Sequence, residues 1–404
     1  PVAAAPADPG QAATAAAPRR RAASREEKAE VVKEANAFAF DLYARLRADE
    51  KHRGKNLFFS PFSISSALAM TYAGAGGDTA AQMAKVMHFN LESQQLHPAF
   101  SDLTAGLNGR GEKGAFRLAV ANRLWGQVDY HFLQNFLELN KLYYGAGIER
   151  LDFARETEKS RLTINKWVEE RTQGKIKDLL LPPDLDNRTR MVLTNAIYFK
   201  GDWARPFDSK RTGDAQFSVS ADRKVTVPMM SQLTEFRYAH AKGLQVLELP
   251  YEGKDLAMVV LLPERTSSLE ALEKELTAER LDGWLKGLHQ DAFMVSLPKF
   301  KLEWRLNLKE ALQAMGMTDA FDDTKADFSA MDGTRELYIA KVIHKAFVAV
   351  DEKGTEAAAA TAVVMRERGM PPSFVADRPF IFLIRDRKTG SILFLGRVVD
   401  PTAG

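Results

Sequence analysis

The first part of the chain has the spacing of amphipathic and buried helices. From about Arg25, apolar residues recur every three or four positions with charged residues between them; they are Val31, Ala35, Phe38, Leu42 and Leu46. Residues 56–71 contain a Ser-Pro break and are otherwise almost wholly apolar, which predicts a helix buried on most sides. Residues 160–181 predict a further helix, ended by two consecutive prolines.

The second half of the chain is dominated by strand signals. Runs rich in Val, Ile, Phe and Tyr are bounded by Gly, Pro and Asp; they begin at Met191, Leu244, Leu256, Phe293 and Phe380. We find no fixed-period repeat and no alternation of strands and helices of the kind that builds a doubly wound sheet. The predicted class is therefore α+β, with helices early and sheets late.

Composition narrows the possible partners. The 404 residues are 45% hydrophobic and 27% charged, as in an ordinary globular protein, and the longest apolar stretch, residues 256–262, is too short to cross a bilayer. Residues 1–28 carry five basic and three acidic side chains and so contribute +2 of the formal charge of +3. A nearly neutral body offers no electrostatic footprint for a phosphate backbone, so we expect no nucleic acid partner and no membrane span.

The N-terminal stretch is rich in Ala and Pro. It has almost no large apolar side chains to bury, which predicts a disordered tether over residues 1–28 before a folded domain over residues 29–404. The chain begins at Pro1 without a methionine and without the apolar core of a signal peptide. We expect a processed chain that is secreted or periplasmic, with a cytoplasmic location left open.

Signals for catalysis, metals and cofactors are missing. The seven histidines include no pair four residues apart, the chain has no cysteine, and no Gly-x-Ser-x-Gly nucleophile motif occurs. The glycines at positions 109, 111 and 114 match a dinucleotide fingerprint formally, but a helical stretch precedes them where a strand is required. We therefore predict no cofactor, no metal site and no enzymatic activity.

The unusual segment is VDEKGTEAAAATAVVMRERGMPP, residues 350–372. Helix propensity alone would make its alanine-rich part an exposed helix. With a period of two, small uncharged residues share one face; they are Thr355, Ala357, Ala359, Thr361 and Val363. Glu356, the only charge between Gly354 and Val364, points the other way. Such a segment could enter the middle of a sheet.

Several long motifs, in order along the chain, resemble those of the serpin family. They are FSPFSISSALAMTYAGAGGDTAAQM, INKWVEERTQGKIKDLL, TNAIYFKGDWARPF, VPMM, HKAFVAVDEKGTEAAAAT and FVADRPFIFLIRDRKTGSILFLGRVVDP. The resemblance covers residues 30–401 and implies a single serpin domain with three β-sheets, eight to nine helices and an exposed reactive-centre loop at about residues 352–374. It implies that the loop is bait, and that after cleavage its first part inserts into the central sheet while the protease stays bound as an acyl-enzyme.

The resemblance also assigns positions in the loop. The hinge must consist of small residues, and it maps onto Glu352, Gly354, Thr355, Glu356, Ala357, Ala358, Ala359, Ala360 and Thr361. Family spacing places the scissile residue sixteen positions after Glu352, at Arg368, and eleven before Pro379. The predicted reactive bond joins Arg368 to Gly369, and an arginine there fits the acidic specificity pocket of trypsin-like proteases.

Two further sites come only from the resemblance. A polar cluster under the central sheet, the shutter, would contain Ser60, Ser63, Asn195 and His344. Trp203 would lie beneath the point where the loop enters the sheet, the breach. Ordinary core packing remains an alternative for His344 and for the tryptophan.

Some features limit the target and leave other functions open. Glu367 disfavours proteases, such as thrombin, that prefer a small residue or proline before the scissile arginine. The helix after Thr79 lacks a Lys and Arg cluster, so we expect no strong heparin site, and we expect a monomer. The alternatives are a non-inhibitory serpin acting as carrier or chaperone, a cross-class inhibitor of cysteine proteases, and a hydrolase. Asn187 begins a glycosylation sequon by pattern.

Overall fold

The computed structural model describes residues 20–111, 116–145, 147–355 and 372–403. The α-helices of these residues are α1 (Arg25–Ala48), α2 (Pro61–Tyr72), α3 (Gly77–Met87), α4 (Ser93–Gly111), α5 (Gln134–Tyr144), α6 (Thr157–Arg171), α7 (Leu269–Glu275), α8 (Ala278–Lys286), α9 (Lys309–Met315) and α10 (Ser329–Asp332). The strands are β1 (Leu57–Phe59), β2 (Phe116–Gln127), β3 (Glu149–Leu151), β4 (Met191–Asp202), β5 (Gly213–Ser218), β6 (Lys224–Ala241), β7 (Leu244–Pro250), β8 (Leu256–Pro263), β9 (His289–Pro298), β10 (Phe300–Asn307), β11 (Val342–Val350), β12 (Gly354–Thr355), β13 (Ser373–Val375), β14 (Phe380–Asp386) and β15 (Ile392–Val398). The predicted α+β class is confirmed.

Local chemistry explains where the early helices begin. α1 starts after Ser24, whose side chain accepts from the Glu27 amide while the Glu27 carboxylate accepts from the Ser24 amide, which is a capping box. α2 starts at Pro61, with Ser60 as its N-cap. The Ser-Pro break predicted in the sequence is therefore the helix start, and the three apolar residues just before Ser60 form β1 instead.

Two sequence expectations need correction. The helix predicted over residues 160–181 ends at Arg171, because Gln173 and Gly174 adopt positive φ angles of 55° and 75° and turn the chain. The predicted boundary between residues 28 and 29 falls inside α1. Arg20, the first described residue, pairs with Asp102 on α4 at 3.1 Å.

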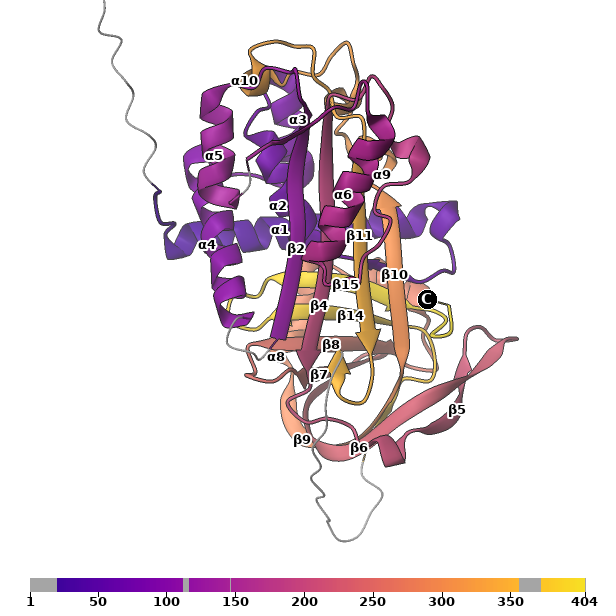
Figure 1. The fold of residues 1–404 in the computed structure, drawn as a ribbon. Helices are drawn as coiled ribbons and strands as arrows, with labels where there is room; N and C mark the ends of the chain where they lie inside the picture. Colours follow the sequence, from indigo (N-terminus) through magenta and orange to yellow (C-terminus); the bar gives the residue numbers. More distant parts are fainter. Residues whose placement is uncertain (1–19, 112–115, 146, 356–371, 404) are drawn as a thin grey trace, which may run out of the picture.

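A six-stranded sheet runs through the centre of the domain. Its order is β10-β11-β4-β2-β3, with β12 paired to the end of β4. β4 and β11 are parallel, and each is antiparallel to its other long neighbour. Figure 1 shows α6 lying across one face of this sheet, while α2, β14 and β15 lie behind the other.

The remaining strands form one nine-stranded hydrogen-bonded sheet in the order β1-β15-β14-β8-β7-β6-β9-β13, with β5 paired to β6. β6 spans 18 residues and pairs in turn with β5, β9 and β7. Because this long strand is shared, the described strands form two hydrogen-bonded sheets where three were expected.

The core has two parts, one on each face of the central sheet. The larger cluster lies between the two sheets and includes Phe199 and Leu393. The smaller one packs α6 against β2, β4 and β11 through residues such as Ile164, Tyr198 and Phe347. The central sheet is thus covered on both faces, as its nearly continuous apolar strands require.

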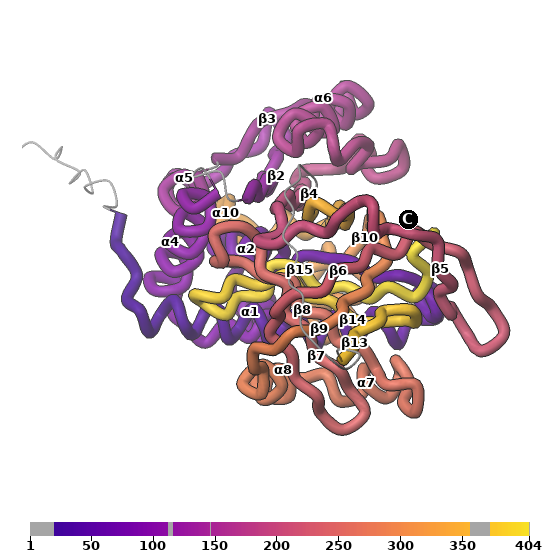
Figure 2. Tube along the Cα trace, turned by 90° about the horizontal axis from the view of Figure 1, so that it is seen from below, coloured from indigo at the N-terminus to yellow at the C-terminus, as the bar shows by residue number. Residues whose placement is uncertain are grey.

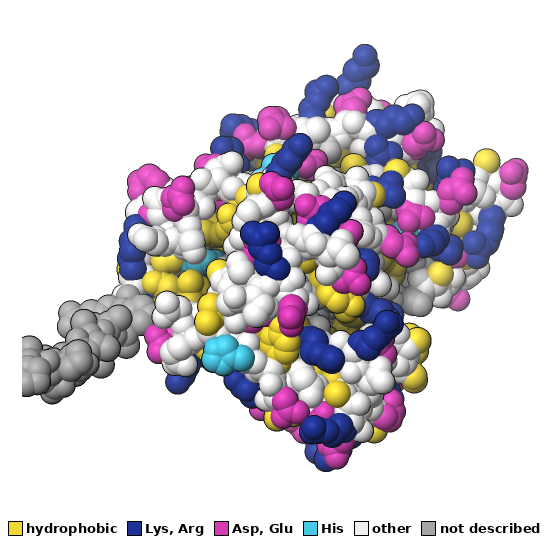
Figure 3. All heavy atoms as spheres, turned by 90° about the horizontal axis from the view of Figure 1, so that it is seen from above, with side chains coloured by type: hydrophobic (Ala, Val, Ile, Leu, Met, Phe, Trp, Pro, Cys, Tyr) yellow, Lys and Arg dark blue, Asp and Glu magenta, His cyan; other side chains and the backbone are white. Residues whose placement is uncertain are grey.

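The surface carries charged side chains of both signs (Figure 3). On the face seen in Figure 3, Lys and Arg side chains are interspersed with Asp and Glu. Among the described residues, no helix is long and apolar enough to span a membrane. Within the same residues no group of three or more His, Asp or Glu side chains is placed to hold a metal ion.

Candidate functional site

The structure describes part of the predicted site. Arg368, Gly369 and the hinge residues from Glu356 to Thr361 lie outside the described residues. The described members fall into two groups at separate places on the central sheet. Glu352, Gly354, Thr355 and Trp203 lie at one end of β4 and β11. The four shutter residues lie further back on these strands and at the start of α2.

A tight turn returns the chain from β11 onto β4. Asp351 bridges Gly354, and β12 then pairs antiparallel with β4, Gly354 opposite Asp202 and Thr355 opposite Gly201. Gly354 has a φ angle of 149°, and a Cβ there would stand 2.2 Å from the carbonyl oxygen of Gly201. Only glycine fits this close approach of two backbones.

Thr355 is fully buried at the end of this turn. Its Oγ1 lies 3.0 Å from the hydroxyl of Tyr251, which is buried too. The Tyr251 ring stacks on Trp203, with centroids 4.7 Å apart and an interplanar angle of 11°. Trp203 also fixes the tight turn through two hydrogen bonds. Its side-chain Nε1 donates to the carbonyl oxygen of Asp351 at 3.0 Å, and its backbone amide donates to the carbonyl oxygen of Lys353 at 2.8 Å.

Glu352 anchors the same turn to the edge of the sheet. Its carboxylate accepts from Thr212 Oγ1 and from Lys299 Nζ, each at 2.8 Å. Burial would raise the pKa of Glu352, but the hydrogen bonds from Lys299 and Thr212 outweigh it, so that the pKa is lowered. The carboxylate therefore stays ionised and paired.

The shutter residues join β4 and β11 to the start of α2. His344 and Asn195 are register partners across the parallel pair of strands, and His344 Nδ1 contacts Asn195 Oδ1. His344 Nε2 accepts from the Ser60 amide at 3.2 Å. Asn195 Nδ2 donates to Ser63 Oγ at 2.7 Å. The structure thus brings all four predicted residues together, which sequence spacing alone could not do.

The protonation state of His344 follows from these contacts. Since Nε2 accepts a hydrogen bond, the proton of the neutral ring lies on Nδ1 and is donated to Asn195. Burial lowers the pKa of His344 to about 3. A second proton would therefore break the contact with Ser60 and place an unpaired charge between the strands.

Sequence reasoning missed several residues of both groups. Asn122 on β2 lies opposite Asn195, and its Oδ1 accepts from Asn195 Nδ2 at 2.6 Å and from Ser63 Oγ at 3.2 Å. Tyr251 and Lys299 were missed as well. Each meets its partner only through the fold, at separations of 73, 104 and 53 residues respectively. No local pattern marks them.

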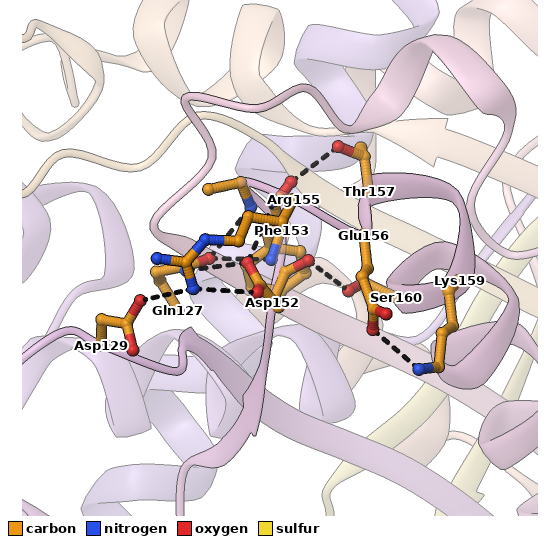
Figure 4. A network of polar contacts seen from close by, with 10 residues as sticks. Gln127, Asp129, Asp152, Phe153, Arg155, Glu156, Thr157, Lys159 and Ser160 are labelled. Atoms are coloured by element: carbon orange, nitrogen blue, oxygen red, sulfur yellow. Dashed lines mark hydrogen bonds and ion pairs between the residues drawn. The ribbon is translucent and has the colours of Figure 1, made fainter.

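α6 covers the two parallel strands from the outside. Figure 4 shows how its start is fixed: the side-chain oxygen of Gln127, at the end of β2, accepts from the amides of Phe153 at 2.7 Å and Ala154 at 3.2 Å. The Gln127 amide group donates to Asp152 Oδ1 at 3.2 Å. Ser160 on α6 donates to the Asp152 carbonyl oxygen at 3.1 Å. A buried amide thus ties the helix to the sheet beneath it.

Comparisons with known proteins agree on one family. Residues 33–401 match the family model described as serpin (serine protease inhibitor). The leukocyte elastase inhibitor of Homo sapiens is 44% identical over 374 residues, covering 90% of this chain and 97% of that protein. Serpin B6 of Macaca fascicularis is 45% identical over 381 residues, covering 92% of this chain and all of that protein. Neither the family model nor these relatives support the expectation that the chain is secreted.

Solved structures show the same fold. Uncleaved ovalbumin superposes with a TM-score of 0.83 at 32% identity, covering 92% of this chain and 100% of that one. A structure described as a tumour suppressing serpin gives the same TM-score and coverage at 28% identity.

Proposed function

The chain belongs to the serpin family of serine protease inhibitors, and from this premise we propose that it traps trypsin-like serine proteases by inserting its cleaved loop into the six-stranded sheet. The protease attacks Arg368 and forms an acyl-enzyme, and insertion of the segment that follows Thr355 then carries the enzyme away from its starting position.

The position of β12 is the observation that carries this proposal. β11 and β4 are parallel and paired from Val342 to Phe347, and at their ends β12 stands beside both, bridged to Asp351 and paired with β4. Because β12 runs antiparallel to β4, a strand that continued it would run between β4 and β11. The pairing of these two strands would have to open to admit it.

The hinge sequence suits that course. Extending the register of Thr355 and Gly201 would set Ala357 against Phe199 and Ala359 against Ile197. Phe199 and Ile197 belong to the larger core cluster, which is already filled. Small side chains are what such a face can accept, because larger ones would overpack it.

The energy and travel are sufficient to deform a catalytic site. About 12 to 14 inserted residues at roughly 3.3 Å each move the tethered enzyme on the order of 40 Å. At about 1 kcal/mol for each net hydrogen bond, insertion yields on the order of 10 kcal/mol. A displacement of about 1 Å within a catalytic site can slow a reaction on the order of 100-fold, so the acyl bond persists.

The shutter is proposed to gate the insertion. The contact between His344 and Asn195 crosses the pair of strands that must separate. At the other site Tyr251, which stacks on Trp203, holds Thr355, the residue after which the inserted segment begins. Both groups therefore act on the sheet and not on the bond that is cut.

The decisive experiment mixes the protein with trypsin and resolves the products by SDS gel electrophoresis. We expect an SDS-stable complex, and we expect Arg368→Ala to abolish it with trypsin. Leukocyte elastase is a parallel arm, because a relative is named as its inhibitor and elastases accept small residues at the cleaved position. A complex with elastase alone would overturn the trypsin-like specificity. Cleavage of the loop by both enzymes without any complex would favour a non-inhibitory serpin.

A further inference from the structure

A basic hollow opens beside Trp203. It has a volume of about 310 Å³. Its walls come from the segment after β4, from β6, β7 and β9, and from the turns that follow β7 and β14. Four basic side chains line it, namely Arg205, Arg237, Lys254 and Arg387. They face two carboxylates from the same lining, Glu235 and Glu248.

The two carboxylates leave much of this positive charge uncompensated. Arg237 and Arg387 share one oxygen of the buried Glu248, at 2.9 Å and 3.4 Å. Glu235 accepts a hydrogen bond from the neutral amide of Gln290 at 2.8 Å. A single carboxylate thus serves two guanidinium groups.

The other two cations have no carboxylate partner within the described part of the chain. Arg205 is exposed and donates to two neutral acceptors, Thr234 Oγ1 at 2.7 Å and the carbonyl oxygen of Glu235 at 2.9 Å. Lys254 is exposed on the turn before β8, with a φ angle of 59°, and its ammonium group makes no ion pair there. The hollow is therefore built to attract anionic oxygens.

The hollow lies between the two attachments of the reactive-centre loop. Trp203, on one wall, binds Asp351 and Lys353 at the start of the loop. Gln290, on another wall, lies on β9, where Met294 binds the carbonyl oxygen of Pro372 at the end of the loop. Figure 2 looks onto this pole, with β9 and β13 next to each other.

A protease that engages the loop must stand over this region. Arg368 precedes Pro372 by four residues, a length of chain that spans at most about 14 Å. A protease domain of about 220 residues has a radius of gyration of roughly 17 Å, so its surface extends well beyond the bond it cuts. Among possible anions, carboxylates of the protease itself are thus brought to the hollow when the enzyme engages the loop.

We propose that this hollow is a second contact site for the target protease, and that it takes an acidic side chain from the enzyme surface beside the enzyme's active-site cleft. The inference rests on the function proposed above. The contact steers the encounter, so it changes the association rate and leaves the fate of the acyl-enzyme untouched.

The test compares trypsin with trypsin whose surface lysines have been succinylated, which turns cations into carboxylates. Both enzymes are normalised by active-site titration, and association rate constants are measured at low salt. We expect the succinylated enzyme to react at least about 3-fold faster with the unmodified inhibitor. Lys254→Glu should abolish this gain and Lys254→Gln should reduce it. Lys85→Glu is the matched control, because Lys85 is an exposed lysine on α3 without an ion pair in the described residues, and it should keep the gain.

The outcomes separate the two proposals. An equal gain from succinylation in the unmodified inhibitor, Lys254→Glu and Lys85→Glu would overturn the contact site. The absence of any rate gain from succinylation would also overturn the contact site. This holds even if calorimetry shows that inorganic phosphate binds the unmodified protein and not Lys254→Glu, because the hollow would then bind an anion without acting on the protease. If trypsin cuts the loop without forming a complex, the proposed inhibitory function is wrong. The ratio of the cleavage rates with succinylated and unmodified trypsin would still test the contact at the hollow.

Discussion

Replacing Thr355 by arginine tests strand insertion most directly. Thr355 is fully buried opposite Gly201, with its hydroxyl 3.0 Å from that of Tyr251. Within the described residues its hydroxyl pairs with a neutral group, the hydroxyl of Tyr251, so an arginine here would bring a charge into a buried site. The substitution therefore expels the start of the hinge from the sheet and opposes its return after cleavage.

The energetic cost of the buried arginine decides whether insertion still outruns deacylation. An unpaired buried charge costs several kcal/mol, and a cost of about 4 kcal/mol at the first step slows insertion on the order of 1,000-fold. Complete insertion, worth on the order of 10 kcal/mol, remains downhill. The competition is kinetic: deacylation finishes before insertion starts, and the inhibitor becomes a substrate.

The assay counts inhibitor molecules consumed for each trypsin molecule inactivated. We expect this stoichiometry to rise at least about tenfold for Thr355→Arg, with cleaved inhibitor replacing complex on the gel. Thr355→Ser keeps the hydroxyl and should leave the stoichiometry near that of the unmodified inhibitor. Thr355→Met introduces a long side chain without a charge and so separates the effect of side-chain length from that of charge. An unchanged stoichiometry for Thr355→Arg would refute insertion that begins at this residue.

Three further predictions concern stability. The folded-state pKa of His344 is about 3 against an ordinary 6.5, so between these pH values the unfolded chain binds a proton that the folded chain does not. The contribution of neutral His344 to the free energy of unfolding is therefore complete above pH 6.5 and falls by about 1.4 kcal/mol per pH unit below it. Urea denaturation at pH 7 and pH 5 should show a smaller loss for His344→Gln, and an equal loss would contradict the assignment. Lys299→Ala leaves the carboxylate of Glu352, whose side chain is 13% exposed, without its cation, and should cost about 1 to 3 kcal/mol. Lys301→Ala, two residues further along at the start of β10, is the control in thermal melting. Gly354→Ala forces a Cβ against the Gly201 carbonyl oxygen and should destabilise by about 1 to 3 kcal/mol, so an unchanged melting temperature would show that the turn rearranges freely.

Local pattern determined the elements whose structure depends on near neighbours. The start of α2 at a Ser-Pro pair and the apolar face of α1 follow from capping chemistry and a 3.6-residue period. The helix predicted to run on to residue 181 failed because its apolar residues Ile176 and Leu180 are buried by tertiary packing after the chain has turned at Gln173. Periodicity records burial and cannot tell a helix from a packed loop.

The sequence by itself determined the α+β class and, through its family motifs, the serpin fold; it also predicted the cluster in which Ser60, Ser63, Asn195 and His344 meet. The tertiary structure alone decided that Asn122 completes the shutter, that Tyr251 holds Thr355, and that β12 stands at the end of the parallel strands. The basic hollow likewise gathers side chains from five separate parts of the chain. The reason is physical: a hydrogen bond or a charge depends on distance in space, and chain order sets that distance only for near neighbours.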